Sequence, residues 1–386
     1  MLPASINSTT LQPFELMQLP EHLCGSQGTN RYDAKHCQIN ANNDLQAIQC
    51  WLNEFYDSPQ TLRNYRKEAE RLLLWSTSLR NKALSDLGRE DFQHYQEFLI
   101  NPQPSQLWCG PRAERISSKW RPFKGPLSDN SQRQALIIIN ALFSYLVDAG
   151  YLAGNPLSLI RRRNRKLRPQ ADQAISQQRY LDQKTWQLLK EHLANQPIES
   201  TKQQNHYQRN QFLFHLLYLM APRVSEVSSH SMNSFRLYRG QWWWFVLGKG
   251  EKLGKVPASD EMLSALMAYR RHLGLNPLPS EDDTSPLIRS ISGTKGISAN
   301  MVYRQVKSVV QNAATSIREE HPIQASILDK ASTHWFRHTS VTHGDDAGID
   351  LKYLTRSARH EKIETTAIYQ HAEDDKWHKA WQKLKF

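Results

Sequence analysis

The carboxyl-terminal half of the chain carries arginine, lysine, histidine and tyrosine residues that together could cleave a phosphodiester bond without a metal ion. Such a cleavage requires a nucleophile, a proton donor for the departing alkoxide, and cations that hold the non-bridging oxygens as charge shifts. Arginine suits the last task because its planar guanidinium donates two parallel, charge-assisted hydrogen bonds to a phosphate. In chain order the set consists of Arg223, Lys249, His334, Arg337, His360 and Tyr369.

The spacing of these residues is more informative than any one of them. His334 and Arg337 are three residues apart, and His360 and Tyr369 are nine apart. In this order the set resembles the tyrosine recombinases, the family of phage integrases and Xer-type recombinases. The resemblance covers roughly residues 43–386, because the helical amino-terminal half also resembles the core-binding domain of that family.

The resemblance implies roles for the arginines and the tyrosine. Arg223 and Arg337 correspond to the two arginines that clamp the scissile phosphate. Tyr369 corresponds to the nucleophile that gives a 3′-phosphotyrosyl link and a free 5′-hydroxyl. A phenol has a pKa of about 10, so neighbouring cations or a base must assist its attack. Glu226 lies three residues after Arg223 on one helical face, and we expect it to orient that guanidinium.

The remaining members of the set handle protons and hydrogen bonds. His334 is the candidate to assist the phenol, and His360 is the candidate for a phosphate hydrogen bond. Lys249, in a predicted hairpin turn, matches the family's general acid for the leaving 5′ oxygen. Lys252 and Lys255 lie close to Lys249 in sequence and remain alternatives for that role. The sequence predicts no metal and no cofactor, and the phosphate-binding motif G-x-x-x-x-G-K-S/T is missing.

Two positions near the set depart from what the family usually has. Where the family has Leu-Gly-His, this chain has Ala358, Arg359 and His360, so the loop loses a conformationally permissive glycine. The local backbone shape is therefore open, and an added phosphate contact by Arg359 is an alternative. Pro222, directly before Arg223, is expected to restrict the backbone of the residue that precedes it.

Composition limits the kind of partner and compartment. The 386 residues carry a net charge of +12, with a pI near 9.5, which favours polyanionic partners. The longest apolar run, residues 135–147, falls short of the roughly 20 residues that a membrane span needs, so we expect no membrane protein. No secretory signal and no disulfide framework are evident. We expect a bacterial-type cytoplasmic protein associated with the nucleoid.

The hydrophobic pattern predicts a mainly α fold, with a helical core-binding domain and an α+β catalytic domain that holds a small three-stranded antiparallel sheet. We expect an amino-terminal extension (1–42), either loosely ordered or packed over a domain, a helical DNA-clamping domain (43–160), a basic linker (161–177) and a catalytic domain (178–386). The expected strands are 235–238, 241–247 and 255–258. Three consecutive tryptophans, Trp242 to Trp244, must alternate between the faces of the second strand.

Three segments allow two interpretations each. A basic, aromatic stretch at 102–127 fits a DNA-contacting loop or a solvated one. The apolar stripe of Trp377, Trp381 and Leu384 fits a terminal helix that docks on a neighbouring protomer or packs on its own domain. The linker is expected to contact DNA, with a solvated linker as the alternative. Its basic residues are Arg161, Arg162, Arg163, Arg165, Lys166 and Arg168.

The sequence therefore predicts an enzyme that cleaves and rejoins specific duplex DNA sites for integration, excision or resolution of a mobile element. The expected assembly is a homotetramer on two DNA sites, formed from free monomers or dimers, with accessory DNA-bending or directionality factors as further partners. Two alternatives are a type IB topoisomerase, which uses the same chemistry without synapsis, and a catalytically silent DNA-binding directionality factor. Salt-sensitive DNA binding is expected in every case, so affinity alone does not discriminate between them.

Overall fold

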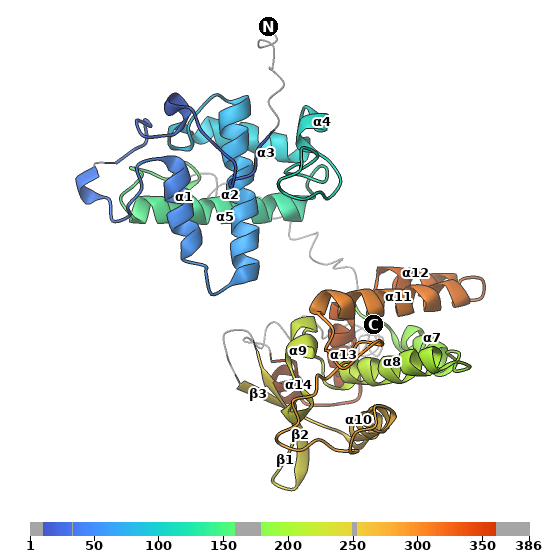
Figure 1. Ribbon diagram of the computed structural model, residues 1–386. Helices are drawn as coiled ribbons and strands as arrows, with labels where there is room; N and C mark the ends of the chain where they lie inside the picture. Colours follow the sequence, from blue (N-terminus) through green and yellow to red (C-terminus); the bar gives the residue numbers. More distant parts are fainter. Residues whose placement is uncertain (1–10, 33, 159–178, 249–252, 360–386) are drawn as a thin grey trace, which may run out of the picture. The chain divides into compact units, whose positions relative to one another are not determined.

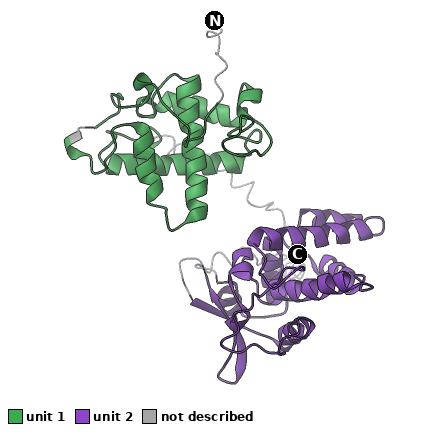
Figure 2. Cartoon of the chain, viewed as in Figure 1, with its two compact units in different colours: residues 1–170 green, residues 171–386 purple. Residues whose placement is uncertain are grey.

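The computed structural model describes residues 11–32, 34–158, 179–248 and 253–359 (Figure 1). The chain divides into two compact units, residues 1–170 and 171–386, and each is described by itself (Figure 2). Several of the predicted functional residues lie outside the described residues. They are Lys249, Lys252, His360, Tyr369, the basic run 161–168 and the apolar stripe 377–384.

The first unit is helical. Its hydrophobic core lies between helices whose apolar residues recur at helical spacing, such as Leu72, Leu73 and Leu146, all fully buried. Side-chain capping defines the start of α1, where Asn43 accepts a hydrogen bond from the backbone N–H of Gln46. The α-helices are α1 (Asp44–Asn53), α2 (Pro59–Leu79), α3 (Arg89–Ile100), α4 (Ser105–Trp108) and α5 (Asp129–Asp148).

The segment 11–42 packs onto these helices. Leu11, Phe14 and Leu23 are buried, and the backbone N–H of Phe14 donates a hydrogen bond to the Glu70 carboxylate in α2 at 2.8 Å. The backbone N–H of Tyr32 donates to the carbonyl of Tyr151 at 3.1 Å. The described part of the amino-terminal extension is therefore packed over a domain, which is one of the two interpretations that the sequence allowed.

The stretch 102–127 uses much of its basic and aromatic content inside the unit. Trp108 and Trp120 are buried, and Arg71 of α2 donates hydrogen bonds to the Pro122 carbonyl. Arg115 forms ion pairs with Glu15 at 2.7 Å and with the buried Glu70 at 2.6 Å. The residues of this stretch that remain exposed and basic are Arg112, Lys119 and Lys124.

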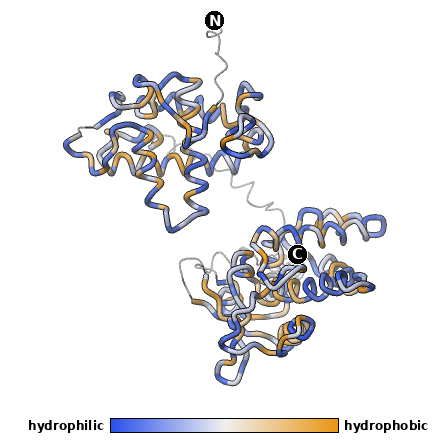
Figure 3. Tube along the Cα trace, viewed as in Figure 1, coloured by the Kyte–Doolittle hydropathy of each residue, from blue (hydrophilic) through white to orange (hydrophobic). Residues whose placement is uncertain are grey.

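The second unit packs helices around one large apolar core and carries the sheet at its edge (Figure 1). Apolar and polar residues alternate along its helices, as they do in the first unit (Figure 3). No helix within the described residues is long and apolar enough to cross a membrane. The α-helices are α7 (Gln183–Ala194), α8 (Thr201–Leu219), α9 (Val224–Ser229), α10 (Asp260–His272), α11 (Ala299–Ile317), α12 (Pro322–Lys330), α13 (Thr333–Asp346) and α14 (Leu351–Ala358).

The sheet has three antiparallel strands in the order β1 (Phe235–Tyr238), β2 (Gln241–Leu247) and β3 (Leu253–Pro257). The predicted range of the third strand was wrong by two residues at its start, because the ladder continues to the pair Leu247 and Leu253. Trp244 is fully buried, whereas Trp243 lies on the opposite face, as the alternation requires. The predicted mainly α fold with a small antiparallel sheet is confirmed.

Candidate active site

Arg223 occupies the position where α9 begins. Its backbone N–H donates a hydrogen bond to the Glu226 carboxylate at 2.7 Å, which satisfies one of the unpaired donors at the start of a helix. The Arg223 guanidinium also donates to Glu226, at 3.0 Å, so the contact expected from their spacing is present. The Arg223 side chain remains 38% exposed and can therefore reach a ligand.

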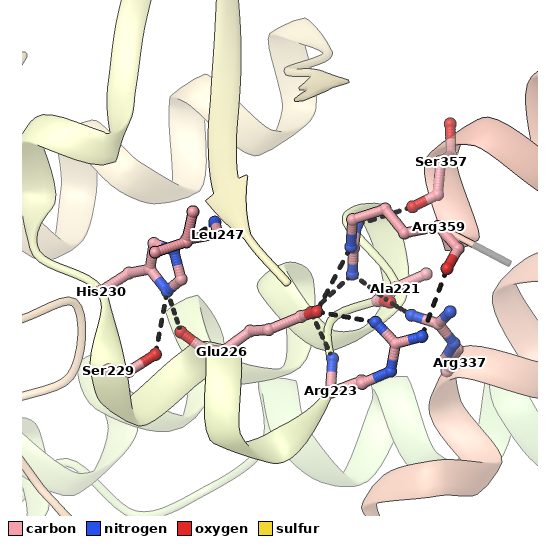
Figure 4. A network of polar contacts seen from close by, with 9 residues as sticks. All are labelled: Ala221, Arg223, Glu226, Ser229, His230, Leu247, Arg337, Ser357 and Arg359. Carbon is pink, nitrogen blue, oxygen red and sulfur yellow. Dashed lines mark hydrogen bonds and ion pairs between the residues drawn. The ribbon is translucent and has the colours of Figure 1, made fainter. Parts of the chain in front are cut away.

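The turn between α8 and α9 brings the second arginine to the same place. Ala221 has a φ of +45°, a left-handed conformation that costs a residue with a Cβ atom energy. This conformation places the Ala221 carbonyl where Arg337, on α13, donates a hydrogen bond to it at 2.7 Å (Figure 4). Pro222 thus follows a left-handed residue rather than an extended one.

Glu226 is the acceptor at the centre of this cluster. Its side chain is only 4% exposed, and it receives hydrogen bonds from Arg223 and from Arg359. Burial on its own raises the pKa of a carboxylic acid, but the charge of Arg359 and the hydrogen bonds from both arginines outweigh it, so the pKa of Glu226 is lowered. Glu226 is therefore ionised at neutral pH.

Arg359 is turned inward, and the contacts of its side chain in the described structure are with protein groups. Its side chain is 8% exposed and pairs with Glu226 at 2.6 Å. It also donates to the carbonyls of Ser357 at 2.7 Å and Ala221 at 3.1 Å. The backbone keeps a glycine-like conformation, with a φ of +52°, even though glycine is replaced. The local backbone shape that the sequence left open is thus left-handed.

His334 lies in the first turn of α13, three residues before Arg337. Although His334 is exposed at the surface, its pKa is lowered, first by desolvation and then by the positive charges of Arg337, Arg179 and Arg223. A neutral imidazole accepts a proton, whereas an imidazolium does not. The surroundings of His334 therefore suit a proton acceptor at neutral pH.

His230 belongs to this site and was missed by the sequence reasoning. Its ring bridges the end of α9, at the Glu226 carbonyl, and the end of β2, at the backbone N–H of Leu247. The strand end that it holds leads directly into the hairpin segment that contains Lys249. A polar, aromatic residue four positions after Glu226, just before the strands, was the available signal.

The sheet places one of the three candidate lysines, Lys255. Lys255 lies in β3 with its ammonium 4.3 Å from the ring centre of Tyr238 and 4.5 Å from that of Trp243. A Cβ atom on its neighbour Gly254 would point to the other face of the sheet, toward Arg359. Lys255 therefore points away from the arginine cluster. Lys249 and Lys252 lie outside the described residues.

The described part of the candidate site can hold and polarise a phosphate. Two arginines from separate helices, a neutral histidine and an ionised glutamate come together from α9 and α13. Guanidinium pairs of this kind stabilise the charge that develops on phosphoryl oxygens.

Comparisons with known proteins agree with this geometry. The model of the phage integrase family matches residues 187–376. Tyrosine recombinase XerC of Corynebacterium glutamicum is 29% identical over 198 residues, which are 51% of this chain and 58% of that relative. Tyrosine recombinase XerC of Chlorobaculum tepidum is 25% identical over 344 residues, which are 86% of this chain and 93% of that relative.

Solved structures show the same fold. The XerH site-specific recombinase bound to its difH substrate, in a pre-cleavage complex, matches with a TM-score of 0.57 and 15% identity over 88% of this chain and 84% of that chain. The Tn1549 transposon integrase in complex with transposon right end DNA matches with a TM-score of 0.55 and 16% identity over 88% of this chain and 99% of that chain.

The fold and the arginine cluster define the catalytic domain of a phage-integrase-type enzyme. The chain belongs to the tyrosine recombinase family, as the resemblance implied. It is a site-specific recombinase, an enzyme that cleaves and rejoins DNA strands. Neither the topoisomerase nor the silent binding factor gains support from these matches.

Proposed function

We propose that Tyr369 is the nucleophile of this recombinase, that Arg223 and Arg337 clamp the scissile phosphate, and that Lys249, His334 and His360 assist. The observation that carries this proposal is the convergence of Arg223 and Arg337 on the turn at Ala221. These two arginines lie on helices far apart in sequence, and the same turn brings both guanidiniums to one place.

In the proposed cleavage step, the phenolic oxygen of Tyr369 forms a bond to the phosphorus and the bond from phosphorus to the 5′ oxygen breaks. The phenolic proton passes to the neutral imidazole of His334, and Lys249 gives a proton to the departing 5′ oxygen. His360 donates a hydrogen bond to the phosphate. Rejoining reverses these transfers, with a 5′-hydroxyl of the partner strand as the attacking group. No nucleotide hydrolysis is needed, because the phosphotyrosyl bond keeps the energy of the broken backbone.

The proposed substrate is duplex DNA with a specific recombination site. XerH bound to difH and the Tn1549 integrase bound to transposon DNA are examples of related folds on such sites. The basic run 161–168 would follow the phosphate backbone between the two units. We further propose a tetramer on two synapsed sites, in which the stripe at 377–384 docks on a neighbouring protomer. Its place of action is the nucleoid of a bacterial cytoplasm.

A nicked suicide substrate tests the assignment of the nucleophile. On such a DNA the fragment with the free 5′-hydroxyl diffuses away, so a covalent adduct accumulates. Tyr369→Phe should bind this DNA with unchanged affinity and form no adduct. Tyr353→Phe, which removes an exposed phenol on α14, is the matched control and should form the adduct as the wild type does. A persistent adduct in Tyr369→Phe would refute the assignment.

A further inference from the structure

Arg359 stands out because a left-handed backbone position and a buried charge meet in one residue. A φ of +52° favours glycine, and an arginine there carries a conformational cost. Burying a guanidinium is also costly unless it is paired. Two unfavourable features in a single residue persist only if the contacts of that residue offset them.

The contacts of Arg359 reach both arginine sites. Its guanidinium donates to Glu226, the partner of Arg223, at 2.6 Å. The same nitrogen donates to the Ala221 carbonyl at 3.1 Å, the oxygen that also accepts from Arg337. Its own backbone carbonyl accepts a hydrogen bond from the Arg223 guanidinium at 3.2 Å (Figure 4). Arg359 is therefore bonded to the immediate partners of both clamp arginines.

Arg359 also adds a positive charge to the cluster around Arg223 and Arg337. Without Arg359, Arg223, Arg337 and the buried Glu226 would together carry a formal charge of +1, because the carboxylate neutralises one of the two guanidiniums. With Arg359 present, the described cluster holds three guanidiniums and one carboxylate, so its formal charge rises to +2. Because the interior screens charge weakly, this excess makes an anion more favourable beside Arg223 and Arg337.

The sheet leaves room for this side chain. The Arg359 guanidinium lies 5.6 Å from the ring centre of the buried Trp244 in β2. A Cβ atom added to Gly254 in β3 would lie 3.0 Å from the Cδ atom of Arg359, tighter than ordinary contact. Gly254 thus leaves the space through which the Arg359 side chain reaches Glu226.

We propose that Arg359 is a positioning residue of the phosphate clamp: it neutralises Glu226 and fixes Arg223 and Arg337 so that both guanidiniums are available to the scissile phosphate. This inference rests on the proposed function, because it concerns the same phosphate. It concerns a position at which this chain departs from the usual glycine of its family.

The test compares Arg359→Gly with the wild type on two nicked suicide substrates. One has an ordinary phosphodiester at the cleavage position, and the other has a neutral methylphosphonate there. Glycine accepts the left-handed conformation, so the variant is expected to fold. We expect the single-turnover cleavage rate on the phosphodiester to fall about 10- to 100-fold, with DNA affinity unchanged. On the neutral substrate, the variant should match the wild type within about threefold, because no anionic charge needs to be held.

Three further variants sharpen the result. Arg356→Ala removes an exposed arginine from α14, the helix that ends directly before Arg359, and should cleave both substrates as the wild type does. Arg359→Lys keeps the charge but loses the planar fork, and we expect an intermediate rate on the phosphodiester. Gly254→Ala replaces no arginine, but its methyl group crowds the Arg359 side chain. This variant should therefore lower the cleavage rate on the phosphodiester and not the rate on the methylphosphonate.

The outcomes separate this inference from the proposed function. If wild-type protein forms no adduct with the phosphodiester, the proposed function fails and Arg359 is not the cause. If the wild type forms the adduct and Arg359→Gly cleaves the phosphodiester equally fast, the positioning role is overturned. Equal losses on both substrates would also overturn it, because they would indicate a merely structural residue. Should Arg359→Gly unfold, as judged by circular dichroism, Gly254→Ala decides by the same criteria.

Discussion

The Nε2 atom of His230 accepts a hydrogen bond from the backbone N–H of Leu247 at 2.8 Å, which ties the end of β2 to the end of α9. The Nδ1 atom of the same ring lies 2.9 Å from the Glu226 carbonyl and, with Nε2 acting as acceptor, is the nitrogen that donates. One imidazole therefore joins the helix that carries Arg223 and Glu226 to the strand that leads into the segment with Lys249.

Replacing His230 should slow cleavage without weakening DNA binding. In His230→Phe the bridge between α9 and β2 is lost, and a misplaced proton donor lowers the rate of bond breaking. We expect a reduction of about 10- to 100-fold in single-turnover cleavage. His272→Phe on α10, where the histidine contacts Asn205, is the control and should keep its rate. An unchanged rate in His230→Phe would show that the bridge does not position the hairpin.

The choice of general acid can be tested by changing the leaving group. Lys249→Ala should cleave an ordinary phosphodiester at least about 100-fold more slowly, because the 5′ alkoxide departs without a proton. A substrate with sulfur in place of the 5′ oxygen needs no such proton, so it should restore the rate of this variant. Lys255→Met should leave both rates unchanged, because Lys255 lies over Tyr238 and Trp243 on the other face of the sheet. A sulfur-rescued defect in Lys255→Met would reverse the assignment.

The pKa of His334 should be below its ordinary value of 6.5, and the arginines should be part of the cause. Protonation adds a positive charge beside Arg337 and Arg223, so removing one of those charges makes protonation easier. Arg223→Gln should therefore raise the pKa of His334, measured by NMR titration of the ring. Arg271→Gln, an exposed arginine on α10, should leave it unchanged.

The same shift has a consequence for activity. Because neutral His334 is the proposed proton acceptor, the cleavage rate should stay at its plateau as the pH falls from 8 to 6.5, and decline only below that value. In His334→Gln the plateau should be lower and this acid-side decline should disappear. A decline that begins above pH 6.5 in the wild type would contradict the role given to His334.

Arg115 should contribute to stability rather than to DNA binding. Arg115→Ala leaves the buried Glu70 without its guanidinium partner, although Glu70 still accepts from the backbone of Phe14. We expect a loss of about 1–2 kcal/mol in the free energy of unfolding, at the lower end of such effects because the Arg115 side chain is 38% exposed. Arg112→Ala, an exposed neighbour, should leave stability unchanged. A large loss of DNA affinity with unchanged stability in Arg115→Ala would contradict this interpretation.

Local patterns predicted much of this molecule, and tertiary packing accounts for what they missed. The mainly α fold, the hairpin strands and the contact between Arg223 and Glu226 follow from spacing along the chain, where neighbours are fixed by helix and strand geometry. The inward turn of Arg359 depends on Trp244 and Gly254, which lie more than a hundred residues earlier in the sequence. No local pattern encodes such a contact.

The turn at Ala221 and the loop at 102–127 illustrate the same limit. Pro222 restricts its neighbour, but it did not indicate a left-handed Ala221, a conformation in which the Ala221 carbonyl is shared by Arg337 and Arg359. The sequence allowed the stretch 102–127 to be a DNA-contacting loop, because Glu70, the partner of Arg115 within it, is distant in sequence. Charge and residue type alone do not distinguish a buried ion pair from a ligand contact.

The most direct test of the account identifies the amino acid that becomes bonded to DNA. Wild-type protein is incubated with the nicked suicide substrate, the covalent complex is isolated and digested, and the nucleotide-bearing peptide is sequenced by mass spectrometry. The account predicts a single modified peptide in which the 3′-phosphate is esterified to the oxygen of Tyr369. Attachment at any other residue, or cleavage without a covalent peptide, would contradict it.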